Sequence, residues 1–289
     1  LRLVIISTVI GKNSTPNTFT KCEKKEIENI DKSKDFPFLL NMTPSTVISS
    51  DAGNGLGYTG VRVRGIDPTR VNITVNGIPI NDPESQGMFW VNMPDLASST
   101  QSVQIQRGVG TSTNGAASFG ASVNIRTNDL AEEKYTLATF GLGSFNTQRI
   151  SLLHNTGRLK NNWAFQLRGS AIQSDGFIDR ASSDLKSANL VAAKYWDKSV
   201  FKANIMLGSE RTYQAWNGIP EPTFKGDIAD ENRYISQLYI GGDALQNLQK
   251  SNSQTYNSYT YENEVDNYNQ NHYQFFFDHS FTNFLKLNT

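Results

Sequence analysis

The sequence has one cysteine, Cys22, in 289 residues, and no apolar run approaches the roughly 18 residues that a membrane-spanning helix needs. A single cysteine excludes an intrachain disulfide framework and a cysteine-cluster metal site. Net charge is also absent, because 27 basic and 27 acidic residues cancel. We expect no nucleic-acid partner, since neutralising phosphates requires a basic patch. The missing apolar run does not exclude a membrane protein, because the strands of a membrane barrel are short and alternate.

The residue patterns of common enzymes are missing as well. None of the three histidines, His154, His272 and His279, belongs to an HExxH motif, and no Gly-x-Ser-x-Gly elbow occurs. The Gly-rich segment 51–60 leads into a strand instead of a helix, and segment 108–120 lacks a Gly-Lys-Ser/Thr ending, so neither predicts a phosphate site. We predict that the chain is not an enzyme and has no catalytic residue, no metal ligand and no cofactor of its own.

Residues 60–127 have the pattern of a small folded sheet. Apolar residues alternate with polar ones in short runs, as at Ile73 and Val75, and Gly, Pro and Asn separate the runs. Asn76-Gly77 follows directly and favours the positive φ angles of a two-residue hairpin turn. We therefore predict a hairpin at this point.

The segment before this sheet predicts a strand, a linker and two short helical turns. Residues 1–10 are apolar and β-type, and residues 11–20 are rich in small polar side chains, which is typical of a flexible linker. The first strand is either an edge strand of the following domain or a docking strand that joins a partner by backbone hydrogen bonds. A short helix is expected from Glu23 to Ile30, and a second apolar turn from Phe36 to Leu40.

Two stretches allow both a structural and a functional interpretation. Arg62 and Arg64 project from one face of a strand. On an exposed sheet they are solvated, whereas inside an enclosure each guanidinium needs a carboxylate or carbonyl partner. The loop 82–92 contains Met88-Phe89-Trp90, which serves either for packing or for ligand contact.

From residue 135 onward the pattern changes to long strands with clean alternation. In one of them Phe165 and Leu167 share one face, while Gln166 and Arg168 share the other. One face is thus apolar and the other polar over segments of about ten residues. The predicted strands are 135–143, 147–156, 161–173, 186–196, 199–209 and 268–285.

The connections between these strands are alternately short and long. Short ones are predicted at 157–160 and 197–198, and long ones at 174–185 and 210–267. This asymmetry is typical of an outer-membrane barrel, which has brief periplasmic turns and extended external loops. A soluble antiparallel sandwich would also alternate, but its strands usually have about five or six residues. The predicted strands are too few to close a barrel around the preceding sheet, so we expect a C-terminally truncated chain.

Several long motifs resemble a known family. VRVRG, NITVNGIPINDPESQGMFWVNMPD and SVQIQRGVGTSTNGAASFGASVNIRT closely resemble the plug domain of TonB-dependent outer-membrane receptors. Later motifs, among them GSFNTQRISLLHNTG, TYQAWNGIPE and YTYENEVDNYNQNHYQ, look like the first strands and loops of the barrel in these receptors. The resemblance covers nearly the whole chain.

The resemblance implies a mainly β fold. Its elements are a transmembrane antiparallel β-barrel, of 22 strands in this family and partial here, and a small α+β plug domain inside it. The implied divisions are a TonB-box-like strand and linker at 1–20, the plug domain at 21–130 and the N-terminal part of the barrel at 131–289. The implied location is the outer membrane of a Gram-negative bacterium, in contact with its lipids.

The resemblance also implies partners. The apolar run near the N-terminus sits where the family carries its TonB box and by likeness pairs with TonB, which transmits force from the proton-motive ExbB and ExbD complex. The implied TonB contacts are Leu3, Val4, Ile5, Ile6 and Ser7.

The function implied is TonB-dependent import of a scarce, bulky nutrient, with rearrangement of the plug. The expected cargo is an iron–siderophore complex, so that iron enters only as part of the ligand. Haem, cobalamin, a glycan or a peptide are alternative cargoes, and a soluble β-rich binding or adhesion protein is the alternative from another class.

If the sheet is enclosed in a barrel, the resemblance implies functional roles for its arginines and for the loop 82–92. The arginines expected to form plug-to-barrel ion pairs are Arg62, Arg64, Arg107 and Arg126. The residues expected to contact the ligand are Asn54, Leu56, Tyr58, Gln86, Met88, Phe89, Trp90, Tyr213 and Trp216.

Overall fold

The computed structural model describes residues 18–30, 33–109, 117–282 and 284–289. The fold is mainly β, with three sheets of five, two and seven strands. We call the part up to residue 127 the inner unit and the seven-stranded sheet the wall. No helix in the described part of the chain is long and apolar enough to cross a membrane.

The inner unit is built on a five-stranded sheet with the strand order β1-β6-β7-β4-β5. Strands β4 and β7 pair in parallel, and the other neighbours pair antiparallel. Its strands are β1 (Phe19–Glu23), β4 (Val71–Val75), β5 (Ile78–Pro79), β6 (Thr100–Arg107) and β7 (Ala121–Thr127). The second sheet pairs β2 (Thr46–Ser50) with β3 (Thr59–Val63).

The predicted hairpin is confirmed. Val75 pairs with Ile78 across the turn, and Asn76 and Gly77 have φ angles of 56° and 82°. Two successive positive φ angles match the strand twist, and Asn followed by Gly adopts them at low cost.

The beginning of the described chain differs from the prediction in two respects. The predicted linker 11–20 ends in strand β1, because Phe19 pairs with Gln106 and Thr20 with Ile105. The predicted helix forms only over Lys24–Glu28 (α1), where a reciprocal capping box joins Glu23 and Glu26. Four short 3₁₀ helices complete the described part of the inner unit: η1 (Phe36–Leu40), η2 (Pro68–Arg70), η3 (Trp90–Asn92) and η4 (Leu96–Ser99).

The largest hydrophobic core of the described residues lies mainly in the inner unit, and Met206 of the wall also belongs to it. Alternating residues of the central strands fill it, and Ile27 from α1 and Phe36 from η1 cover it. Phe36 stacks on Trp90 with ring centroids 5.0 Å apart. The residues of the five-stranded sheet in this core are Val71, Ile73, Val75, Val103, Ile105, Ala121, Val123 and Ile125, and Val61 and Val63 of β3 join them.

The wall is an open antiparallel sheet in which β8 to β14 are neighbours in chain order. All six predicted strands form, but the last one ends at Ser280 and the chain then reverses into a further short strand. The strands are β8 (Tyr135–Gly143), β9 (Thr147–Arg158), β10 (Trp163–Ser174), β11 (Ser183–Tyr195), β12 (Ser199–Tyr213), β13 (Val265–Ser280) and β14 (Lys286–Asn288).

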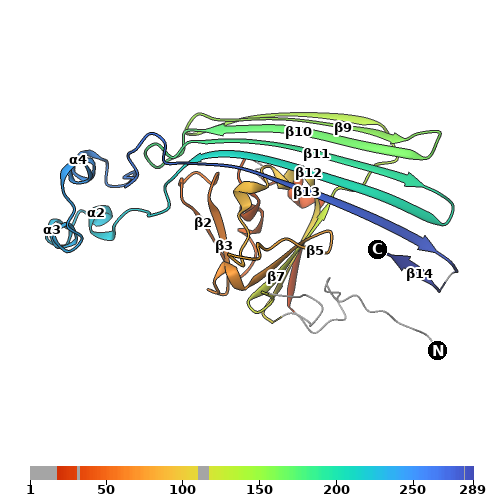
Figure 1. The fold of residues 1–289 in the computed structure, drawn as a ribbon, viewed down its shortest axis with the longest axis horizontal. Coiled ribbons are helices and arrows are strands. Elements are labelled where there is room, and N and C mark those ends of the chain that lie inside the picture. The colour runs from red at the N-terminus through yellow and green to blue at the C-terminus, as the bar shows by residue number, and fades with distance from the viewer. Residues whose placement is uncertain (1–17, 31–32, 110–116, 283) are drawn as a thin grey trace.

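The long connections fall at one end of the wall and the predicted short ones, after β9 and after β11, at the other (Figure 1), but the short turn 144–146 between β8 and β9 shares the end of the long connections. The longest connection, between β12 and β13, is not an irregular loop. It contains α2 (Glu221–Lys225), α3 (Ile228–Gln237) and α4 (Gly242–Lys250), which lie beyond the ends of the strands. The inner unit lies against one face of the wall, nearer to these helices than to the short turns.

Candidate functional site

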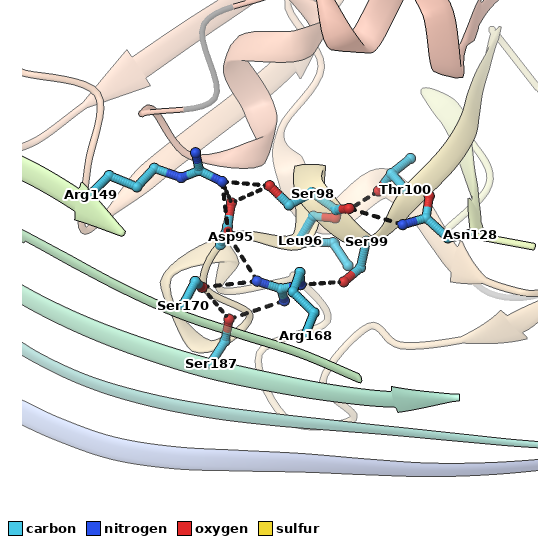
Figure 2. Close-up of polar contacts among 10 residues, drawn as sticks. All are labelled: Asp95, Leu96, Ser98, Ser99, Thr100, Asn128, Arg149, Arg168, Ser170 and Ser187. Carbon is cyan, nitrogen blue, oxygen red and sulfur yellow. Dashed lines mark hydrogen bonds and ion pairs between the residues drawn. The ribbon is translucent and has the colours of Figure 1, made fainter. Parts of the chain in front are cut away.

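The inner unit and the wall are joined by a buried cluster of charges (Figure 2). Arg149 on β9 donates from Nη2 to both oxygens of Asp95, over 3.0 and 3.1 Å. Arg168 on β10 donates from Nη1 to Asp95 Oδ2 over 2.7 Å. Ser98 and Ser99 accept further hydrogen bonds from the same two guanidinium groups. The three charged residues are no more than 5% exposed, so the pairs are shielded from water.

Local geometry presents Asp95 to the wall. Its φ angle is 54°, a left-handed conformation that directs the chain into η4. Every second side chain along β9 and β10 faces the inner unit. Arg149 on β9 and Arg168 on β10 are among these side chains. Because breaking a buried ion pair leaves an uncompensated charge, this cluster is a strong attachment point.

The arginines expected from the sequence lie elsewhere. Arg62 is 3.6 Å from Asp67 and Arg126 is 2.8 Å from Asp129, and both of these pairs are exposed.

The remaining two predicted arginines also lie against residues of the inner unit itself. Arg107 donates to Thr20 Oγ1, and Arg64 lies beside Gly108. Within the described residues, the ion pairs between inner unit and wall therefore use different arginines from the four predicted. The sequence indicated one partner of this cluster, because Arg168 lies on the polar face of its predicted strand. Nothing in the sequence indicated that Asp95 would pair with it.

A second junction involves the tip of the Asn76-Gly77 hairpin. Asn76 Nδ2 donates to Gln274 Oε1 on β13 over 2.8 Å, and Gln274 Nε2 donates to the Val75 carbonyl over 3.2 Å. Gln274 is 4% exposed and also accepts from Asn204 on β12. The hairpin tip is thus hydrogen-bonded into the wall.

A third junction lies near the end of the wall that carries the long connections. The hydroxyl of Tyr58, in the loop between β2 and β3, donates to Asp266 on β13. The Tyr58 ring makes edge contacts with Trp216, at 5.1 Å between centroids, and with Phe89, at 6.3 Å. Burial raises the pKa of Tyr58, and the hydrogen bond to Asp266 raises it further, so the hydroxyl keeps its proton and remains a donor.

A pocket of about 770 Å³ opens beside Tyr58, between the inner unit and β13. One side is the segment from Ile80 to Asn92, and the other is a row of alternate β13 residues. Those β13 residues are Asp266, Tyr268, Gln270 and His272.

The pocket loop is shaped by Asp82. Its Oδ1 accepts hydrogen bonds from the backbone N–H groups of Glu84 and Ser85, over 3.0 and 2.7 Å. These bonds, that of Ser85 above all, lower the pKa of Asp82 below its usual range. Asp82 therefore stays negatively charged at neutral pH.

Only some of the nine residues expected to contact a ligand lie at the pocket. Tyr58, Met88 and Phe89 line the pocket, and Trp216 adjoins it through Tyr58. Gln86 lies in the same loop, but it is exposed and is not part of the pocket lining.

The other four have structural partners. Leu56 is buried against Val91, Ile172 and Leu185, and Trp90 belongs to the main core. Asn54 donates to Ser174 on the wall over 2.8 Å, and Tyr213 donates to the Tyr261 carbonyl over 2.8 Å.

Residues 3–7, expected to contact TonB, lie outside the described residues. In the part of the chain that the structure covers, no group of three or more His, Cys, Asp or Glu side chains could hold a metal ion.

Comparison with protein families matches residues 11–122 to the TonB-dependent receptor plug domain. A comparison with curated protein sequences finds no match.

Solved structures with a similar fold cover most of this chain. The ferric-catecholate import receptor Fiu from E. coli K12, in its closed form, is 16% identical over 93% of this chain and 35% of its own, with a TM-score of 0.69. FpvA from P. aeruginosa, bound to a heterologous pyoverdine and iron, is 13% identical over 93% of this chain and 32% of its own, with a TM-score of 0.66. This chain thus spans about a third of the length of these receptors.

Proposed function

Because the chain carries a TonB-dependent receptor plug domain followed by part of a barrel-like sheet, we propose that it belongs to an importer in the outer membrane. Receptors of this family are transporters and not enzymes. In this proposal residues 1–20 reach TonB, residues 21–130 form the plug and residues 131–289 form the first part of the barrel.

The observation that carries the proposal is the polarity of the wall. Its inward positions hold buried polar residues such as Arg168, which donates to Ser99 of the inner unit, and Asn204, which accepts from Asn189 on the neighbouring strand. Its outward positions hold exposed large apolar residues, which are Phe140, Ile150, Leu152, Leu167, Leu190, Leu207, Tyr273, Phe275 and Phe277. A soluble sandwich buries its apolar face, whereas a membrane barrel turns that face to lipid. This arrangement favours the outer-membrane importer over a soluble binding or adhesion protein.

The proposed cargo class is an iron–siderophore complex. Support comes from the similar structures, which are a ferric-catecholate import receptor and a receptor bound to an iron–pyoverdine complex, and from a pocket large enough for a bulky ligand. A pocket of several hundred Å³ with aromatic and a few polar groups suits a small molecule of that kind. In this proposal TonB, driven by ExbB and ExbD, pulls residues 3–7 and displaces part of the inner unit.

The test uses the intact receptor in cells and compares Ile5→Pro with Ile5→Ala. Proline removes a backbone donor and blocks strand pairing with TonB, whereas alanine keeps the donor. The expected result is that Ile5→Pro abolishes uptake and leaves cargo binding intact, while Ile5→Ala still transports. Equal uptake by both variants would refute the assignment of residues 3–7, and a receptor recovered as buffer-soluble monomer would refute the membrane importer.

A further inference from the structure

The pocket beside Tyr58 has an unbalanced charge. Its lining includes the carboxylates of Asp82, Glu84 and Asp266, with His272 as the one side chain that could become positive. No lysine or arginine belongs to the lining among the described residues. This contrasts with the Asp95 cluster, in which two arginines neutralise one carboxylate.

A further carboxyl group, that of Glu210, lies next to the lining of the pocket. Glu210 on β12 is a diagonal neighbour of Asp266 on β13, because Glu210 pairs with Tyr268 and Thr212 pairs with Asp266. Glu210 is 1% exposed, and its Oε1 atom has no hydrogen-bond partner in the described part of the chain. Two adjacent carboxyl groups without a counter-charge are stabilised either by a proton or by a nearby cation.

Aromatic rings line the same pocket. Tyr58, Phe89 and Tyr268 are among its lining residues, and Trp216 contacts the Tyr58 ring. Aromatic faces attract ammonium groups, most strongly where water is excluded. Carboxylates and rings together form a lining that favours positive charge and repels negative charge.

We propose that this pocket selects a ligand that presents a cationic group, a protonated amine or a quaternary ammonium, to Asp266 and the ring of Tyr58. The inference rests on the proposed function and narrows its cargo. An iron complex with a free ammonium group fits the pocket, whereas a trianionic ferric tris-catecholate meets three carboxylates and is rejected.

The test measures binding of two small probes to the intact receptor in neutral detergent at low ionic strength, by calorimetry. The probes are benzyltrimethylammonium, a cation, and benzenesulfonate, an anion with the same ring. The wild type is expected to bind the cation at least about tenfold more tightly than the anion, and added salt should reduce the difference. The double variant Asp266→Asn, Glu84→Gln is expected to lose most of it.

Two further variants separate charge from structure. Asp278→Asn changes an aspartate at the other end of the same strand, outside this pocket, and should keep the full preference for the cation. Tyr58→Phe removes the hydrogen bond to Asp266 but leaves its charge, and should still prefer the cation.

Three results would overturn the proposal: equal binding of both probes, tighter binding of the anion, or no binding of the cation to the wild type. A preference that Tyr58→Phe abolishes as fully as the double variant would also overturn it, because the hydrogen bond and not the charge would then be responsible. These failures leave TonB-dependent uptake unaffected, so they are distinguishable from failure of the proposed function.

Discussion

Arg168 Nη1 on wall strand β10 lies 2.7 Å from Oδ2 of Asp95 in the inner unit. With Arg149 on the adjacent strand, the cluster carries two positive charges and one negative charge in a place almost without water. Burying such charges costs several kcal/mol unless each finds a partner. Asp95 therefore supplies the charged part of the attachment of the inner unit to β9 and β10.

Replacing Asp95 with asparagine should loosen this attachment. The substitution keeps the size of the side chain but leaves both buried arginines without a counter-charge, at a cost of about 3 kcal/mol. We expect faster hydrogen exchange at the amides of η4 and β6 in the intact receptor, measured by mass spectrometry.

The matched control is Asp129→Asn. Asp129 pairs with Arg126 at 2.8 Å, but both side chains are more than half exposed, so the loss should be at most about 1 kcal/mol. Similar exchange rates in the two variants would contradict the role assigned to Asp95.

The second prediction concerns Gly208, where the inner unit and the wall approach each other closely. A Cβ atom at Gly208 on β12 would clash with the Asn92 carbonyl oxygen and would lie 3.0 Å from Pro94 Cδ. Gly208→Ala should therefore push the backbone of η3 away from the wall, and Trp90 in η3 should become accessible to acrylamide quenching.

Gly169 on β10 serves as the comparison. A Cβ atom there meets nothing within 4 Å, so Gly169→Ala should leave the quenching unchanged. If Gly208→Ala quenches no more than Gly169→Ala, the inner unit does not press on β12 as the structure indicates.

Local sequence signals predicted the features that depend on neighbouring residues. Asn76-Gly77 specifies its own turn, and alternation specifies β8 to β13, because each needs only a few adjacent side chains. Helix α3 also had a local signal, since Asp227 accepts hydrogen bonds from the backbone of Ala229 and Asp230. The prediction for 210–267 was a long connection without this helix.

The choice of ion-pair partners had no such signal. Asp95 and Arg168 are 73 positions apart in sequence, and their pairing depends on how the inner unit is seated on the wall. The four predicted arginines lie in the inner unit, and three of them, Arg62, Arg64 and Arg126, have exposed side chains. Only the tertiary arrangement distinguishes a covered face of a strand from an exposed one.

The stability of the inner unit should depend on pH through Asp35. This carboxyl is 4% exposed and accepts one hydrogen bond from Thr59, and burial raises its pKa to about 8, with the charge of Asp95 adding to the shift. Because the folded pKa is above the unfolded value of about 4, the stability contribution is complete below pH 4 and is lost as the pH rises to 8. The expected slope within that window is about 1.4 kcal/mol per pH unit.

Asp35→Asn tests this dependence, because an amide cannot ionise. Urea unfolding of the inner unit in the intact receptor, followed by near-ultraviolet circular dichroism from pH 5 to 8, should show a falling midpoint for the wild type and a flatter profile for the variant. Parallel profiles would show that Asp35 is not the group responsible.

The last prediction concerns Trp216 and the capture of cargo. Trp216 lies where the long connection leaves β12, and its ring contacts Tyr58 at 5.1 Å and Tyr259 at 6.4 Å. Trp196 is similarly exposed but lies in the short turn between β11 and β12, at the opposite end of the wall. Loss of a central aromatic ring from a binding site typically costs about 2 kcal/mol. Trp216→Ala should therefore raise the cargo concentration for half-maximal uptake more than tenfold, and Trp196→Ala should not change it. Equal effects of the two substitutions would mean that cargo does not enter beside Tyr58, and would remove the reason for assigning that pocket to the ligand.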